Sequence, residues 1–403
     1  MKKINYLEIE GRSTGFWALL GTLGAITLAG IAAFFYMEHS GHHVTGMDNQ
    51  IVWGMPHVFA VFLIVAASGA LNVASIGTVF GKAIYKPLGR LSTLMAIALL
   101  AGGLMVLVLD LGRPDRLVIA MTYYNFKSIF AWNIILYNGF FAVTIVYIWM
   151  MMEKKMIGYY RPAGIVAFIW RLILTTGTGS IFGFIVARSA YDAAIMAPMF
   201  IIMSFSFGLA IFLLVLMLGY QWTERPLGDA VIKRLKNLLG VFVAAVLYFS
   251  LAYHLTNLYA TEHHDVEKFI LAGDSIHTTL FWVMQILIGG IIPLAIIYSK
   301  LSNSRTWLGL ATILIIVGGL AQMYVIIIGG QAFPLELFPG MEIVSSSFGD
   351  ANTYHAYNPS APEIILGVSG IAVAMLIITM GVRVLKFMPL TLADKDVDPH
   401  NKG

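Results

Sequence analysis

The sequence predicts an all-α integral membrane protein with about ten transmembrane helices. Of its 403 residues, 59% are hydrophobic and only 11% are charged, whereas a soluble globular chain carries about 25% charged residues. The apolar residues are gathered in ten stretches, each of roughly 20 residues or more, which is enough to cross about 30 Å of hydrocarbon as a helix. The short connections leave no room for a soluble domain.

The ten expected helices follow one another along the chain with short links. They span residues 16–37, 56–80, 91–111, 129–152, 163–187, 194–220, 238–260, 276–299, 307–329 and 362–387. The first run is longer than the core of about 7–15 residues in a signal peptide, and no small-x-small cleavage site follows it. We therefore expect it to be retained as a helix.

The positive charges are distributed unequally between the two sides of the membrane. With ten helices the loops alternate, so that nineteen lysines and arginines fall on the side of both termini and five on the other side. Cytoplasmic loops collect Lys and Arg, so both termini are predicted to be cytoplasmic. The net charge of +4 reflects this bias and does not indicate nucleic-acid binding.

The chain has no cysteine. Iron–sulfur clusters held by thiolates, zinc–thiolate sites and disulfides are therefore excluded within this chain. Three histidines, His39, His42 and His43, lie together in an outer loop, but exposed loop histidines seldom bind a metal. We predict no metal site.

The motif LDLGRPDRL (109–117) places paired charges at the outer end of an uncharged helix. Gly112 permits the turn that ends the helix, and Pro114 cannot continue it. Asp110 is therefore expected just inside the membrane. Arg113 follows one helical turn later, where it can pair with that carboxylate.

Ionisable side chains within membrane helices are costly and are functional candidates by default. His57 opens the second helix in the same leaflet as Asp110, so the two can face one pocket. Each can accept a proton, and Tyr123, Tyr124 and Trp132 suit the interface or stacking on a flat ring. This combination suits a quinol, although an interfacial His57 and a purely structural ion pair at Asp110 remain alternatives.

Other polar residues lie within the helices. Arg171 is eight residues into its helix, roughly 12 Å deep at 1.5 Å per residue. With Gln285 and Gln322 it could line a proton path from the cytoplasm. His254 and His277, near the outer ends of their helices, are expected to be hydrogen-bonded interfacial residues.

Four stretches carry a resemblance to a known family. They are IVWGMPHVFAVFLIVAASGALNVASI (51–76), LDLGRPDRL (109–117), SIFAWN (128–133) and GGQAFPLELFPGMEI (329–343). The chain resembles the NrfD/PsrC family of quinone-interacting membrane subunits of respiratory complexes, in its ten-helix branch. The resemblance implies four-helix bundles at 56–187 and 194–329, an outer loop at 330–361, and flanking first and last helices, the last at 362–387.

The resemblance also implies a quinone, menaquinone or ubiquinone, near the outer face of the first bundle, with no haem or iron–sulfur cluster in this chain. It places the family's histidine on His57 and its acid and arginine on Asp110 and Arg113. The implied partner is a periplasmic ferredoxin-like iron–sulfur subunit, for which Arg116 would help form the docking surface. Further membrane and cytochrome subunits, sulfur metabolism and a bacterial inner membrane are implied too; the chain would not be catalytic alone.

Two competing interpretations stay open from the sequence. A haem-b cytochrome needs two histidines at similar depth, and a pair of His57 with His254 would satisfy this. A secondary transporter would use a midplane site at broken helices, such as the glycine-rich TTGTGS (175–180) near Arg171. A proton-translocating module would extend the quinone interpretation.

Overall fold

The computed structural model describes residues 4–334 and 354–397, and within them ten helices are long and apolar enough to cross a membrane. Each overlaps one of the ten expected stretches, so the predicted all-α membrane fold is confirmed. The spans are Thr14–Ser40, Met55–Thr78, Ala83–Leu109, Ile129–Met152, Lys154–Gly183, Met196–Trp222, Asp229–Tyr259, Ile276–Tyr298, Arg305–Ala332 and Ala361–Val384.

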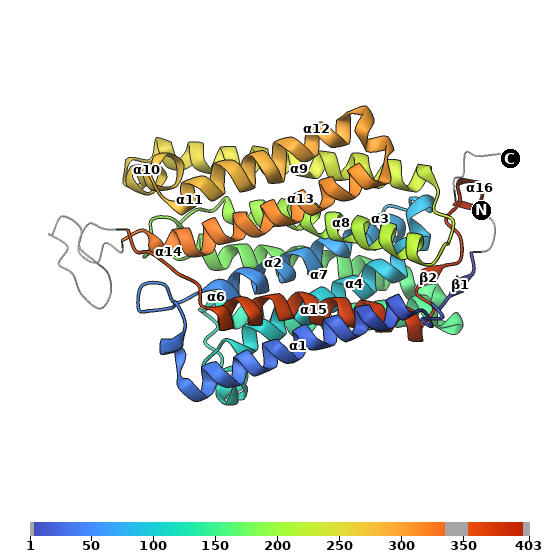
Figure 1. The fold of residues 1–403 in the computed structure, drawn as a ribbon, viewed down its shortest axis with the longest axis horizontal. Helices are drawn as coiled ribbons and strands as arrows, with labels where there is room; N and C mark the ends of the chain where they lie inside the picture. The colour runs from blue at the N-terminus through green and yellow to red at the C-terminus, as the bar shows by residue number, and fades with distance from the viewer. Residues whose placement is uncertain (1–3, 335–353, 398–403) are drawn as a thin grey trace.

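Several spans consist of more than one helical element (Figure 1). The α-helices are α1 (Thr14–Ser40), α2 (Met55–Ala70), α3 (Asn72–Thr78), α4 (Gly89–Leu109), α5 (Leu117–Thr122), α6 (Ile129–Met152), α7 (Tyr160–Gly183), α8 (Met196–Trp222), α9 (Asp229–Tyr259), α10 (His264–Ala272), α11 (Ile276–Thr279), α12 (Ile292–Tyr298), α13 (Arg305–Tyr324), α14 (Gly330–Ala332), α15 (Ala361–Val384) and α16 (Asp394–Val397). Two π-helical segments, η6 (Leu280–Ile291) and η8 (Val325–Gly329), interrupt the eighth and ninth spans.

The second span is the centre of the molecule. In its most apolar window 94% of the residues are buried, whereas the corresponding value for α1 is 17%. Helix α2 packs against α4, α7, α8 and α15, while α1 packs chiefly against α15. Small residues allow this close packing, because Gly69 of α2 lies directly on the backbone of Ser204 in α8.

Eight of the ten spans, α2 among them, form two groups, and α1 and α15 belong to neither. We call α2, α4, α6 and α7 the first helix group, and α8, α9, η6 with α12, and α13 the second helix group. Helix α8 contacts α2 and α7 on one side and α9 and α13 on the other. The groups are therefore in direct contact, and their description as two four-helix bundles stays a prediction.

Both described ends of the chain lie at one end of the molecule (Figure 1). There β1 (Tyr6–Leu7) pairs antiparallel with β2 (Met388–Pro389), and Arg225 donates hydrogen bonds to the carbonyls of Leu7 and Glu8. An even number of crossings brings the chain back to this side. We call the opposite end, which holds α10, α11 and α14, the distal end.

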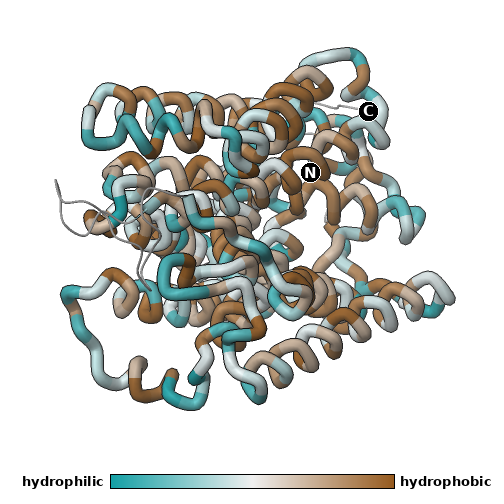
Figure 2. The backbone as a smooth tube through the Cα atoms, turned by 60° about the vertical axis from the view of Figure 1, so that its left-hand side comes forward, coloured by the Kyte–Doolittle hydropathy of each residue, from teal (hydrophilic) through white to brown (hydrophobic). Residues whose placement is uncertain are grey.

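Hydrophobic residues dominate the helices, and hydrophilic residues gather in the loops and at helix ends (Figure 2). The described parts of the expected outer loop, residues 330–334 and 354–361, lie at the distal end. Within the stretch GGQAFPLELFPGMEI, residues 335–343 lie outside the described residues.

Candidate functional site

His57 and Asp110 meet at the distal end of the first helix group. His57 stands in the first turn of α2, whose start carries Pro56, and Asp110 is the C-cap of α4. Because α2 and α4 are antiparallel neighbours, the start of one lies beside the end of the other. His57 Nδ1 is 2.8 Å from Asp110 Oδ2; the carboxylate side chain is fully buried and the imidazole is 16% exposed.

The carboxylate of Asp110 has unused capacity to accept hydrogen bonds. Although His57 Nδ1 is close, no well-directed hydrogen bond from the described residues reaches either carboxylate oxygen. A buried carboxylate is costly unless donors satisfy it. The site therefore suits a ligand that brings hydroxyl donors, and Nε2 of His57 is the ring nitrogen turned away from Asp110.

Aromatic rings form one wall of this site. Trp53 stacks on His57 with ring centroids 6.2 Å apart and planes at 26°. Around Trp53 stand the rings of Phe130, Phe182 and Tyr191, at centroid distances of 6.0, 5.8 and 6.4 Å. Such a wall gives a flat ring a surface on which to stack.

The backbone around Trp53 is held by hydrogen bonds from residues far away in the sequence. Gln331 Oε1 accepts hydrogen bonds from the N–H groups of Val52 and Trp53, both at 3.0 Å, and Gln331 Nε2 donates to the Trp53 carbonyl at 3.0 Å. Arg188 donates to the carbonyls of Gln50 and Gln331. The stretch around Gln331 therefore positions the aromatic wall.

A second set of hydrogen bonds fixes the start of α2. The Tyr357 hydroxyl accepts a hydrogen bond from the N–H of Met55 at 2.7 Å and donates to Glu363 Oε1 at 2.6 Å. Burial and then the neighbouring Glu363 carboxylate raise the pKa of Tyr357 above its ordinary value. The phenol therefore stays protonated and keeps its donor role.

Arg113 does not hold Asp110, which corrects the expected pairing. Its guanidinium pairs with Asp115, with Nε–Oδ1 and Nη2–Oδ2 distances of 3.0 Å, and both side chains are more than half exposed. The hydrogen bond from Arg113 lowers the pKa of Asp115. The helical spacing assumed for Asp110 and Arg113 fails because Gly112, with φ of 69°, turns the chain away from the helix.

Tyr123 and Tyr124 lie away from the His57–Asp110 pair. Tyr123 is 83% exposed, and the ring of Tyr124 packs on Phe126 at 5.8 Å. Arg116 is exposed at the start of α5, a helix with no buried residue. The tyrosine in the aromatic wall is instead Tyr191, whose hydroxyl donates to the Ile327 carbonyl at 2.6 Å.

Sequence reasoning missed Trp53 and Tyr191 because both lie outside the helices. Trp53 precedes His57 by four residues in the motif WGMPH, but α2 begins only at Met55, so helical spacing does not apply. Tyr191 lies between α7 and α8, where no periodicity indicates the direction of a side chain.

Arg171 is fully buried between the two helix groups. It donates to Asn72 Oδ1 at 2.9 Å and to the Ser68 carbonyl at 3.4 Å, and it lies 4.9 Å from the ring centroids of Phe168 and Phe205. No carboxylate pairs with it among residues 4–334 and 354–397. Polar carbonyls and aromatic faces therefore stabilise its charge.

Gln285 and Gln322 come together in the second helix group. Both donate to the Ser250 hydroxyl, at 3.4 and 3.2 Å. The contacts of Arg171 described above include none of these three residues. The three members of the expected proton path are thus divided between two places.

Comparison with known proteins agrees with this architecture. The family described as polysulphide reductase, NrfD, matches residues 43–335. The sequence is 28% identical to the Hdr-like menaquinol oxidoreductase integral membrane subunit of Archaeoglobus fulgidus over 98% of this protein and 99% of that one. It is 22% identical to the C subunit of polysulfide reductase from Wolinella succinogenes over 71% of this protein and 96% of the relative.

A third relative is the menaquinone reductase integral membrane subunit of Nitratidesulfovibrio vulgaris, 20% identical over 89% of each protein. All three are subunits of oxidoreductases whose names include a quinone, a quinol or polysulfide. The family match covers most of the chain and includes the His57–Asp110 pair and its aromatic wall. The chain therefore belongs to the NrfD family of polysulphide reductase membrane proteins.

Proposed function

We propose that this chain is the quinone-interacting subunit of a membrane oxidoreductase complex and that it exchanges protons with a quinol at His57 and Asp110. The observation that carries the proposal is the buried carboxylate of Asp110, which receives no well-directed hydrogen bond from the described residues while a histidine and a stacking wall lie beside it. The names of the relatives support a quinone substrate, and two of them support menaquinone.

The residues fit the head group of a quinol. Asp110 keeps the imidazole proton on Nδ1 of His57, because a carboxylate can only accept, and this leaves Nε2 as a base. Nε2 can then take the proton of a quinol hydroxyl, and Asp110 stabilises the resulting imidazolium. A bound quinol supplies two electrons and two protons in its oxidation, and His57 and Asp110 take one proton each.

Access to the site is from the lipid. The side chains of Val52, Leu111 and Phe130 are 49, 46 and 46% exposed. Val52 and Leu111 adjoin Trp53 and Asp110 in the sequence, and the ring of Phe130 packs on Trp53. A hydrophobic substrate can approach across such an apolar rim without leaving the bilayer. Trp53 then stacks on its ring.

The electrons must leave to a partner. We propose a periplasmic ferredoxin-like iron–sulfur subunit on the distal face, with Arg116 in the docking surface, together with further membrane and cytochrome subunits. This places the distal end outside and both termini in the cytoplasm, in agreement with the distribution of Lys and Arg. Resemblance to DsrP, the membrane subunit of the DsrMKJOP complex, supports a link to sulfur metabolism in a bacterial inner membrane.

The site geometry favours a quinol over a haem shared by His57 and His254. His57 Nδ1 lies 2.8 Å from Asp110 and the ring stacks on Trp53, whereas His254 is hydrogen-bonded to Glu267 and packs on Phe281. Each ring thus belongs to its own cluster. The expected proton path through Arg171, Gln285 and Gln322 remains a proposal, and its two glutamines are taken up below.

The test compares variants of the pair in the purified complex. Asp110→Asn and His57→Gln are expected to lower quinol-dependent electron transfer about 100-fold or more, the usual loss when a general base is removed. Asp115→Asn, an exposed acid of the same loop, is the matched control and should retain the wild-type rate. Wild-type turnover of Asp110→Asn would refute the proposed proton role.

A further inference from the structure

A second histidine–carboxylate pair joins α9, in the second helix group, to the short distal helix α10. His254 of α9 lies with Nδ1 at 2.6 Å from Glu267 Oε2, and Asn257 Nδ2 donates to Glu267 Oε1 at 2.8 Å. The Glu267 side chain is fully buried and the His254 side chain is 9% exposed. The two pairs stand at the same, distal end of the molecule, one in each helix group.

Stability alone does not account for this pair. Helix α10 turns Val266, Phe269 and Ile270 inward together with Glu267, so an apolar residue at this position would extend its buried face. Removing two ionisable groups from water is costly, and replacing a buried pair with apolar residues is often neutral or stabilising. A chemical role is the simplest reason for placing a carboxylate here.

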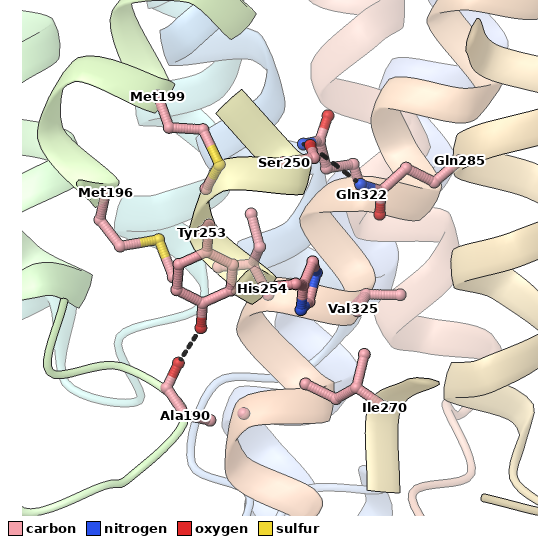
Figure 3. A pocket seen from close by; sticks show the side chains of 12 residues that line it. Ala190, Met196, Met199, Ser250, Tyr253, His254, Ile270, Gln285, Gln322 and Val325 are labelled. Carbon is pink, nitrogen blue, oxygen red and sulfur yellow. Dashed lines mark hydrogen bonds between the residues drawn. The ribbon is translucent and has the colours of Figure 1, made fainter. Parts of the chain in front are cut away.

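A cavity of about 20 Å³ adjoins the pair. Its lining includes His254, Tyr253, Ser250, Gln285 and Gln322, and Figure 3 shows these side chains around one space. Such a volume holds about one water molecule, provided that polar groups can bond to it. The amides and the hydroxyl meet that condition, so the cavity suits a water beside the imidazole.

A second cavity of about 20 Å³ continues from the first towards the middle of the group. It shares Ser250, Gln285 and Gln322 with the first and adds Ser206 and Gly289. The two glutamines, both bonded to Ser250, therefore form a polar partition between the two cavities. Together the cavities form a short route with polar side chains along it, and His254 lines its distal part.

Irregular backbone accompanies this route. Gln285 lies within the π-helical segment η6, and Gln322 lies shortly before the π-helical segment η8. A π-helical turn widens the helix and shifts the direction of side chains, and it occurs often at functional sites. Here the amide of Gln285, from η6, meets that of Gln322, from the last turn of α13, at the Ser250 hydroxyl.

We propose that His254 and Glu267 form a proton-binding site that is separate from the quinol pocket and exchanges its proton with water held along Ser250, Gln285 and Gln322. When the site is empty, His254 is neutral and Glu267 is ionised. Uptake of one proton from a hydronium ion in the cavity leaves a water molecule and brings the pair to zero net charge. Release reverses the step, and no electron moves.

Two of the other titratable groups near the pair, Tyr253 and His263, are bonded elsewhere, and Nδ1 of His277 is buried without a hydrogen bond from the described residues. The Tyr253 hydroxyl donates to the Ala190 carbonyl at 2.7 Å, and His263 Nδ1 lies 2.8 Å from the Ser189 carbonyl oxygen. His277 stacks on Tyr324 at 5.7 Å, and Lys268 is exposed on α10. The pair can thus be examined apart from its neighbours.

The experiment is an infrared difference spectrum of the full chain in lipid nanodiscs, between about pH 5 and about pH 8, which bracket the usual titration of an imidazole. We expect a carboxyl band that changes with pH; Glu267→Gln should remove the band itself, and His254→Gln should alter or abolish its change with pH. Glu262→Gln, whose side chain is 78% exposed, is the control and should keep it. Spectra of both variants that match the wild type would overturn the proposal.

A second measurement tests the route and separates this site from the quinol pocket. Gln285→Leu fills the polar partition with an apolar side chain, so it should slow deuterium exchange of that band while the band itself remains. Unchanged exchange would overturn the water route. Quinol oxidation by Glu267→Gln should stay at the wild-type rate, and its loss would assign the pair to the quinol reaction. If instead the His57 and Asp110 variants keep the wild-type rate, the proposed quinol site is refuted and the proton site at His254 and Glu267 is unaffected.

Discussion

Asp110 and Glu267 show why some site residues can be read from a sequence and others cannot. Asp110 stands at the end of an uncharged helix, so its charge is conspicuous, and its partner His57 opens the preceding helix. Glu267 lies in TEHHDVEKF (261–269), where charges are common, and its complete burial results from the packing of α10. Burial of this kind is a tertiary effect that local sequence does not reveal.

Arg113 provides a test of the corrected geometry. Since its guanidinium bonds to exposed Asp115 rather than to Asp110, Arg113→Gln should leave quinol-dependent electron transfer within about twofold of the wild type, as is usual for exposed ion pairs. The rate is measured in the purified complex beside Asp110→Asn. A loss as large as that of Asp110→Asn would mean that Arg113 does support the buried carboxylate.

At the scale of elements, hydropathy predicts which segments cross the membrane but not which faces touch. Most faces of the spans are apolar, because lipid and a neighbouring helix present similar environments. The π-helical segments η6 and η8 were not predicted either, since hydropathy does not distinguish a π-helical turn from an α-helical one. A glycine is the clearest local sign of a close contact between helices, although it does not identify the opposing helix.

The contact of α2 with α8 should fail when its glycines are enlarged. A Cβ atom at Gly69 would overlap the Ser204 backbone, and one at Gly208 would overlap the backbone of Gly69 and Ala70. Gly69→Ala and Gly208→Ala should each destabilise the fold by about 1–3 kcal/mol or more, seen as a lower melting temperature in detergent. Gly24→Ala on α1, where a Cβ meets nothing within 4 Å, should leave the melting temperature unchanged or slightly raised.

For the whole molecule, the number of crossings follows from the sequence while the arrangement does not. Helices α1 and α2 are comparably apolar, yet α2 is the buried centre and α1 lies at the edge against α15. This difference results from contacts between elements far apart in the sequence, which hydropathy does not show. Contacts of the same kind, such as those between Gln331 and Trp53, hold the aromatic wall, so the site could be predicted in its charged pair but not in its surroundings.

Orientation in the membrane is a property of the whole molecule, and the absence of native cysteine makes it directly measurable. Lys155 and Lys268 are exposed at opposite ends of the molecule, so single-cysteine variants at these positions report the two sides without background. If the excess of Lys and Arg sets the orientation, Lys268→Cys should react with a membrane-impermeant thiol reagent in spheroplasts, and Lys155→Cys only after lysis. The reverse pattern would place His57 and Asp110 at the cytoplasmic face and exclude a periplasmic electron acceptor.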